Sequence, residues 1–361
     1  MNTPETRVLQ ALSRVDDPDL KRDLVSLGMV SNAAVDGNLV SVKVTLTTPA
    51  CPLREKIKTD CLNALVDEFG DGYEFNITMD AQVTSTREKE NVLPGVKNVI
   101  AVASGKGGVG KSTVAVNLAL ALKACGSKVG ILDADIYGPS IPIMLNIKDT
   151  KPEMTKIDGK AFMLPIEQYG LKALSIGMLI DEKQPVVWRG PMASSALRQF
   201  ITDCHWGELD YLIVDLPPGT GDIHLTLVGT APITGAVIVT TPQDVALADA
   251  KKAIGMFTMP QVNVPILGVV ENMAYFTPAE LPNNKYFIFG KGGGERLAEE
   301  FDTNLLGQVP LVQSIREGGD QGVPAMLDDD QLITKAFDEI ASNVARAVAV
   351  RNANFAQPVT A

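Results

Sequence analysis

One eight-residue segment constrains the fold of this chain more than any other part of the sequence. It reads GKGGVGKS at residues 105–112 and fits the pattern G-x-x-x-x-G-K-[ST]. An apolar run precedes it at residues 99–103, and a helical run follows at residues 112–124. In this context the glycines let backbone N–H groups point at a phosphate, and the helix N-terminus adds a favourable dipole. The segment therefore predicts a phosphate-binding loop in an α/β fold, and a flexible Gly-rich turn is the disfavoured alternative.

The side chains of this loop have separate predicted roles in binding a magnesium nucleotide. Lys111 neutralises the terminal phosphates, Ser112 supplies a hydroxyl to Mg²⁺, and Thr113 places another hydroxyl nearby. The predicted nucleotide-binding residues of the loop are Gly105, Lys106, Gly107, Gly108, Val109, Gly110, Lys111, Ser112 and Thr113.

Short apolar runs in the same region predict the sheet to which this loop belongs. They have the continuous Val, Ile and Leu character of strands that are covered on both faces. The runs lie at residues 99–103, 128–132, 211–214, 236–240 and 266–270. We expect a P-loop NTPase with a mostly parallel, doubly wound α/β sheet, whose ligands sit at the carboxyl ends of the strands.

Two carboxylates follow strand ends in this region, where a magnesium nucleotide needs them. LDAD at 132–135 ends the second predicted strand with Asp135, and VDLPPG at 214–219 ends a later strand with Asp215. Mg²⁺ prefers oxygen ligands and is usually held by one or two carboxylates with waters and phosphates. Ser112, Asp135 and Asp215 are therefore the predicted magnesium residues, and Asp135 has the alternative role of orienting the attacking water. Taken alone, each aspartate fits a helix cap equally well.

The chain is too long for one compact core, because it has 361 residues and domains usually contain about 100 to 200. Residues 1–85 predict a small α+β domain with a helix at 5–15, a strand at 39–46 and a helix at 52–69. Residues 86–97 lack apolar periodicity and predict a linker, 98–351 form the predicted P-loop ATPase domain, and 352–361 a flexible tail.

Composition excludes several classes of function. Acidic residues outnumber basic ones by 43 to 32, and the net charge of -11 argues against broad binding to nucleic acid or to anionic lipid. No apolar run reaches the roughly 18 residues that a membrane span needs, and the N-terminus lacks an apolar signal segment, so we expect a cytoplasmic protein. The four cysteines are widely spaced and predict no zinc site.

A set of further motifs makes the chain similar to a known family. Lys106 is a second lysine within the phosphate-binding loop, which is the "deviant" form of that motif. With it, the chain resembles the Mrp/ApbC group of P-loop ATPases. Members of this group act as iron-sulfur cluster carriers and are relatives of the MinD and ParA proteins. The motifs that carry the resemblance are SGKGGVGKST at 104–113, LDADIYGPSIP at 132–142, WRGPM at 188–192, VDLPPGTGD at 214–222, ENM at 271–273 and IREGGDQG at 315–322. The N-terminal region, with TTPACP at 47–52, resembles a small domain that is fused to many members.

The resemblance implies a homodimer that sandwiches ATP between two subunits, with Lys106 reaching the partner's nucleotide. It implies that Asp135 and Asp215 belong to two switch segments, and that Asn272 contacts the adenine base; a turn or cap is the alternative role of Asn272. The expected activity is slow ATP hydrolysis with Mg²⁺, in which Lys106 and Lys111 stabilise phosphate charge and Asp135 acts on the water. The implied partners are apo iron-sulfur proteins or assembly factors, with no nucleic acid and no membrane.

The chain departs from the family at one position that matters for cargo. Many cluster carriers of this family have a C-x-x-C after ENM, whereas residues 274–290 read AYFTPAELPNNKYFIFG without a cysteine. Since thiolates are the usual ligands of iron-sulfur clusters, the bridging site of the family is missing here. Cys51 matches a cysteine of the fused domain and is the candidate iron-sulfur residue, with a small buried strand-end residue as the alternative.

Three functions are therefore compatible with these sequence features. The first is an ATP-dependent iron-sulfur cluster carrier or assembly factor with a dimeric nucleotide switch. The second is a MinD-like or ParA-like spatial switch, although the helix expected at residues 330–351 has few basic residues for binding membrane or DNA. The third is a metal-free, nucleotide-gated protein scaffold, which the missing C-x-x-C keeps open.

Overall fold

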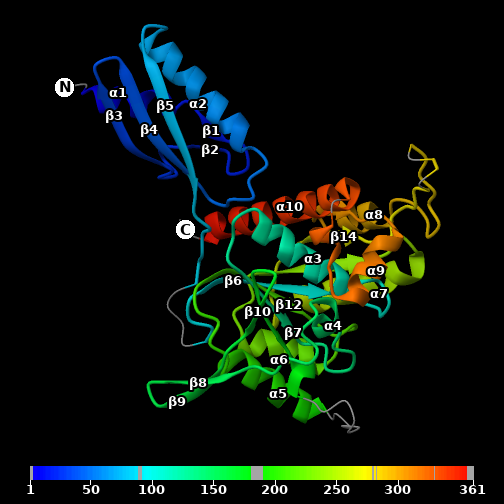
Figure 1. Ribbon diagram of the computed structural model, residues 1–361. Coiled ribbons are helices and arrows are strands. Elements are labelled where there is room, and N and C mark those ends of the chain that lie inside the picture. Colours follow the sequence, from blue (N-terminus) through cyan, green and yellow to red (C-terminus); the bar gives the residue numbers. More distant parts are fainter. Residues whose placement is uncertain are drawn as a thin grey trace. The chain divides into compact units, whose positions relative to one another are not determined.

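A computed structural model describes residues 3–87, 92–179, 190–278, 280–281, 283–328 and 330–355 (Figure 1). The chain divides into two compact units. The small unit contains Met1–Thr86 together with Ala345–Ala361, and the large unit contains Arg87–Val344. Helix α10, Gln331–Phe355, therefore begins in the residues of the large unit and ends in those of the small unit.

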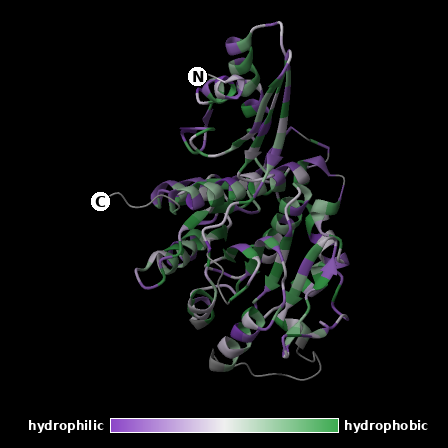
Figure 2. Cartoon of the chain, turned by 90° about the vertical axis from the view of Figure 1, so that its left-hand side faces the viewer, coloured by the Kyte–Doolittle hydropathy of each residue, from purple (hydrophilic) through white to green (hydrophobic). Residues whose placement is uncertain are grey.

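The large unit is built on an eight-stranded sheet with the strand order β10-β11-β7-β12-β6-β13-β14-β15. Neighbouring strands are parallel except for β10 and β11, which are antiparallel. Its strands are β6 Val96–Ala103, β7 Val129–Asp133, β10 Ile166–Gln168, β11 Leu171–Ser175, β12 Leu209–Asp215, β13 Gly235–Thr240, β14 Ile266–Glu271 and β15 Leu305–Gln308. The central strands are mainly hydrophobic in Figure 2, as expected for a sheet that is covered on both faces. The predicted mostly parallel α/β sheet is confirmed.

Helices connect the strands of the large unit, and several of them pack directly on the sheet. They are α3 Lys111–Ala124, α4 Ile141–Met144, η1 Ile176–Leu179, α5 Gly190–Thr202, α6 Asp222–Thr230, α7 Asp244–Thr258, α8 Gly293–Glu300, α9 Gln313–Gln321 and η2 Ala325–Leu327. Helix α3 packs against β6, β7 and β12, and is apolar on nearly every side because it is almost completely buried. Strands β8, Met154–Ile157, and β9, Lys160–Met163, form a separate antiparallel pair.

The register of the sheet brings three strand ends together. Strand β12 lies between β7 and β6, and Asp215 is paired with Asp133 on one side and with Val102 on the other. The loops that follow these three strands therefore start at the same edge of the sheet, which is where parallel α/β sheets bind their ligands.

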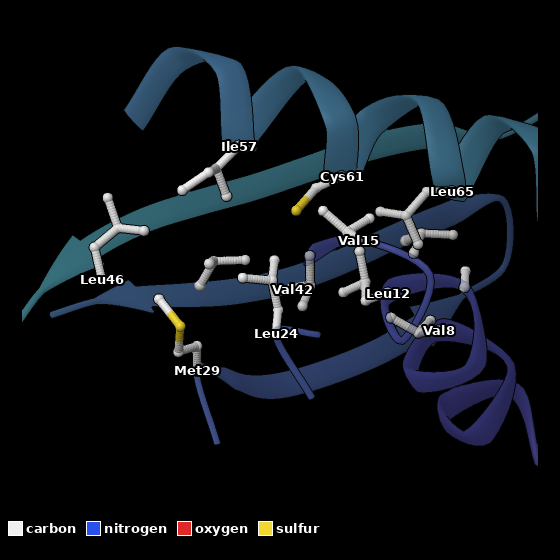
Figure 3. Close-up of a cluster of buried hydrophobic side chains, with 13 residues drawn as sticks. Val8, Leu12, Val15, Leu24, Met29, Val42, Leu46, Ile57, Cys61 and Leu65 are labelled. Atoms are coloured by element: carbon white, nitrogen blue, oxygen red, sulfur yellow. The ribbon is translucent and has the colours of Figure 1, made fainter. Parts of the chain in front are cut away.

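The small unit packs two helices on a three-stranded sheet. Its elements are α1 Pro4–Leu12, β1 Asp16–Asp17, β2 Arg22–Asp23, β3 Val30–Asp36, β4 Leu39–Leu46, α2 Arg54–Phe69 and β5 Glu74–Ala81. Strand β4 pairs antiparallel with β3 and parallel with β5. Its alternating side chains point Val42 and Leu46 into a core that receives Ile57 and Leu65 from α2 (Figure 3).

The helix boundaries at the C-terminus differ from those expected from the sequence. Helix α10 runs to Phe355, so residues 352–355 are helical and do not belong to a flexible tail; residues 356–361 lie outside the described part of the chain. The cause lies in the small unit, where Asn352 is buried and its amide donates to the carbonyl oxygen of Thr84 at 3.0 Å. Strand β6 begins at Val96, so the last two residues of the expected linker are part of the sheet.

None of the helices in the described residues is both long enough and apolar enough to cross a membrane.

Candidate nucleotide-binding site

The loop between β6 and α3 has a path that only glycine permits at two positions. A Cβ atom on Gly105 would lie 2.0 Å from the carbonyl oxygen of Asp249 in α7, so the loop backbone touches that helix directly. Gly110 has a φ of +80°, and a Cβ atom there would lie 2.2 Å from Nδ2 of Asn272. Ser104 steadies the turn because its hydroxyl donates to the carbonyl oxygen of Lys106 at 3.0 Å. This path presents the loop backbone to a ligand.

Lys111 is buried among the carboxylates that the sequence predicted near it. Its Nζ atom lies 2.6 Å from Oδ1 of Asp215 and 3.9 Å from Oδ2 of Asp135. The same Nζ lies 3.3 Å from the hydroxyl of Ser112. The structure thus brings the predicted phosphate residue Lys111 together with all three predicted magnesium residues.

Burial shapes the electrostatics of this cluster. Asp215 is fully buried, and burial raises its pKa, while the neighbouring ammonium of Lys111 opposes that shift. Burial and the charge of Asp215 raise the pKa of Asp133, the last residue of β7, to about 8. One buried cation therefore faces several carboxyl groups, which is an unfavourable balance that a bound cation improves.

The residues around Asp215 fit a magnesium ion. Within the described part of the chain, Oδ2 of Asp215 is buried and accepts no hydrogen bond. The hydroxyl of Ser112 lies close enough to the carboxylate to lower its pKa. A carboxylate oxygen without a partner, beside a hydroxyl at the start of a helix, is the kind of hard-oxygen ligand set that Mg²⁺ takes.

The two predicted switch segments contact the loop in different ways. Asp135 accepts hydrogen bonds from the N–H groups of Tyr137 and Gly138, at 3.2 and 3.3 Å, so its carboxylate organises its own turn. In the segment after Asp215, the N–H of Gly219 donates to the carbonyl oxygen of Ser104 at 2.9 Å. Both segments therefore start from the cluster around Lys111, and the second is tied to the loop itself.

Asn272 lies at the edge of a cavity of about 310 Å³ that begins beside the loop. Its Nδ2 donates to the carbonyl oxygen of Val109 at 2.8 Å, which holds the loop in place. The cavity walls come from the loop and α3, from α4 and the residue before it, from residues 272–273, from 310–312 and from α9: Gly110, Thr113, Ser140, Ile143, Met144, Asn272, Met273, Pro310, Leu311, Val312, Ile315, Arg316, Gly319 and Asp320. The wall from α9 was not predicted, although α9 contains all but the last residue of the motif IREGGDQG.

The remaining predicted loop residues differ in exposure. Lys106, Gly107 and Gly108 are exposed, whereas Val109 is buried beneath the loop. The side chain of Lys106 is therefore open to solvent, in contrast with the buried side chain of Lys111.

Cys51 lies in the small unit and is half-buried. It lines a small pocket with Asp17, Asp19 and Arg346, where the guanidinium of Arg346 forms an ion pair with Asp19 at 2.5 Å. Burial raises the pKa of the Cys51 thiol, so the thiol is protonated at neutral pH. Among the described residues, no group of three or more His, Cys, Asp and Glu side chains is arranged to hold a metal ion.

Comparisons with known proteins agree with both units. The ParA family model, described as NUBPL iron-transfer P-loop NTPase, matches residues 95–345. A second model, described as iron-sulfur cluster assembly protein, matches residues 5–70.

Whole-chain relatives carry one shared description. The chain is 47% identical over 345 residues to a protein of Synechocystis sp., with 95% of this chain and 97% of the relative covered. It is 49% identical over 345 residues to a protein of Deinococcus radiodurans, with 95% of each chain covered. It is 45% identical over 340 residues to a protein of Escherichia coli, with 94% of this chain and 90% of the relative covered. All three are described as iron-sulfur cluster carrier proteins.

Solved structures are similar to the large unit in fold. A nucleotide-binding protein from Archaeoglobus fulgidus in complex with ADP is 38% identical, with a TM-score of 0.57, and the match covers 65% of this chain and 90% of that chain. The septum site-determining protein MinD of Pyrococcus horikoshii, complexed with Mg-ADP, is 22% identical with a TM-score of 0.50, and 68% of this chain and 94% of that chain are covered. At 22% identity, the second match supports similarity of fold alone.

Proposed function

The chain belongs to the family of iron-transfer P-loop NTPases, and on that premise we propose that it binds and hydrolyses ATP with Mg²⁺ to carry iron-sulfur clusters. The observation that carries the nucleotide part is the buried Lys111, held between Asp215 and Asp135 beneath the loop. When a nucleotide binds, Lys111 can exchange its ion pair with the Asp215 carboxylate for one with a phosphate.

The side chains of the site have separate roles in this proposal. The N–H groups of residues 105–111 surround the phosphates, and Lys111 leaves Asp215 to neutralise the terminal phosphate. Ser112 and Asp215 would hold Mg²⁺, which supplies further charge neutralisation on the phosphates when it is bound. Asp135 lies 3.9 Å from Nζ of Lys111 and orients the attacking water. Asn272 lies at the rim of the cavity that receives the adenosine, where its amide fits the base.

The proposal includes a homodimer with a nucleotide between the subunits. Lys106 is an exposed residue of the loop, so its ammonium is accessible to a nucleotide that is bound by a second copy. Hydrolysis then removes the γ-phosphate that both copies contact, and the dimer opens. This arrangement makes cargo release depend on hydrolysis.

The cargo part of the proposal rests on the small unit and on the relatives. Cys51 releases its thiol proton to solvent when iron binds and then supplies a thiolate for an iron-sulfur cluster, and a second copy or an added thiol supplies further ligands. The recipients are apo iron-sulfur proteins or assembly factors. Relatives that match nearly the whole chain are described as cluster carriers, which favours this function over a MinD-like spatial switch. A metal-free scaffold remains the outcome if no specific iron binds.

Replacing Asp135 with asparagine tests the nucleotide part. We expect ATP hydrolysis to fall by about a hundredfold or more, because a positioned general base is typically worth that factor. ATP binding should persist, since Lys111 and the loop backbone are unchanged. ATP should then hold the variant as a dimer, with twice the 38.5 kDa mass of one chain in light scattering.

The matched control is Asp149→Asn, which removes an exposed carboxylate from the same unit. It should hydrolyse ATP at the wild-type rate. Undiminished hydrolysis by Asp135→Asn would remove Asp135 from the mechanism. If the variant binds ATP but keeps the mass of one chain, the proposal of an ATP-bound homodimer is contradicted instead.

A further inference from the structure

Asp133 is a fully buried carboxyl group that the roles above do not use. It is the last residue of β7, and the sheet register places it beside Asp215 on β12 and Ser175 on β11. Its carboxyl oxygens accept hydrogen bonds from Asp135, Ile141 and Ser175. Burying a carboxyl group costs free energy unless the group is hydrogen-bonded, so these partners are needed for its burial.

Two of these bonds close the segment that carries Asp135. Oδ1 of Asp133 accepts from the N–H of Asp135 at 3.1 Å, and Oδ2 accepts from the N–H of Ile141 at 3.2 Å. One carboxyl group thus holds both ends of the segment 135–141. The direction of the Asp135 side chain toward Lys111 depends on this closure, because the backbone of Asp135 is one of the two points held.

The third bond joins that segment to a neighbouring strand. The hydroxyl of Ser175 donates to Oδ2 of Asp133 at 2.9 Å and accepts from the N–H of Gly177 at 3.0 Å. Gly177 belongs to η1, and a Cβ atom on it would lie 2.7 Å from Cγ of Pro139 in the segment. Two independent contacts, one polar and one steric, therefore connect η1 with the segment 135–141.

We propose that Asp133 and Ser175 form a positioning pair, which holds Asp135 in the arrangement that hydrolysis needs and connects it to η1. This inference rests on the proposed ATP hydrolysis at the site. We expect the pair to act on hydrolysis more than on nucleotide binding, because it holds the backbone of Asp135 and of Ile141. It acts on the chemical step through the placement of Asp135, and displacements of about 1 Å can cost a hundredfold in rate.

The test compares kcat and KM for ATP in the full-length variants Asp133→Asn and Ser175→Ala. Asparagine at 133 keeps the shape of the side chain but has a single acceptor oxygen, so either the N–H of Asp135 or the N–H of Ile141 loses its acceptor and the closure is lost. We expect kcat to fall by about ten- to a hundredfold with KM nearly unchanged. Ser175→Ala should show a smaller fall of the same kind.

The control is Ser127→Ala, because Ser127 is also buried but lies before the opposite end of β7. It should keep the wild-type kcat. Each rate is divided by the amount of ATP bound at saturation, so that misfolded protein does not count as lost catalysis. If Asp133→Asn and Ser175→Ala both keep the wild-type kcat per bound ATP, the positioning pair is contradicted, while the proposed ATP hydrolysis is unaffected. A wild-type protein that releases no phosphate would overturn the proposed function, and the pair with it.

Discussion

Replacing Lys111 with alanine is expected to abolish ATP hydrolysis, with a loss of about a hundredfold or more, because a preorganised charge at the phosphates is removed. ATP affinity should fall as well, since Lys111 is the buried cation of the site. Phosphate release and binding of a fluorescent ATP analogue measure the two effects. Hydrolysis near the wild-type rate would contradict the assignment of the site.

The same variant should also change stability without nucleotide. Lys111 is paired with the fully buried Asp215, and removal of one partner from a buried pair typically costs about 3 to 5 kcal/mol. Uptake of a proton by Asp215 reduces this cost, so we expect a loss at or below the lower end of that range in urea denaturation at neutral pH. Lys151→Ala, which removes an exposed lysine, should leave both stability and hydrolysis unchanged.

Replacing Cys51 with alanine is expected to remove the specific iron of the protein. The measurement is anaerobic reconstitution with iron and sulfide, followed by bound iron and visible absorbance for each chain. The thiolate is the usual ligand of such clusters, and within the described part of the chain no group of three or more His, Cys, Asp and Glu side chains could hold the iron in its place.

Cys125→Ala is the matched control for this experiment, because Cys125 is also half-buried and its thiol pKa is also raised by burial. Cys61 and Cys204 are poorer controls, since they are buried and burial raises the pKa of each to about 12. Equal iron in Cys51→Ala and in Cys125→Ala would contradict a cluster at Cys51. No specific iron in the wild-type protein would leave a metal-free nucleotide switch.

The sequence was sufficient to predict the parts of the site that lie close together along the chain. The loop at 105–112 carries its glycines, lysine and serine in one run, and the strand and helix on either side are equally local. Asp135 and Asp215 were predicted because each is a carboxylate close to the end of an apolar strand. The sheet itself followed from continuous apolar runs, whose burial on both faces is confirmed by the structure.

Residues that act through register or packing were not accessible to this reasoning. Asp133 and Ser175 are 42 positions apart and meet only because β7 and β11 are neighbours in the sheet. The α9 wall of the cavity and the meeting of Arg346 with Asp19 depend in the same way on where distant elements pack. Such contacts are set by strand order and helix placement, which local periodicity does not specify.

The central claim is that nucleotide hydrolysis at Lys111 controls the release of iron-sulfur cargo. The most direct test follows cluster transfer from the reconstituted protein to an apo-ferredoxin by circular dichroism, with MgATP, with MgADP and without nucleotide. We predict that MgATP accelerates transfer from the wild-type protein and does not accelerate it from Lys111→Ala carrying the same amount of cluster. Transfer at one rate from both proteins under all three conditions would contradict the claim.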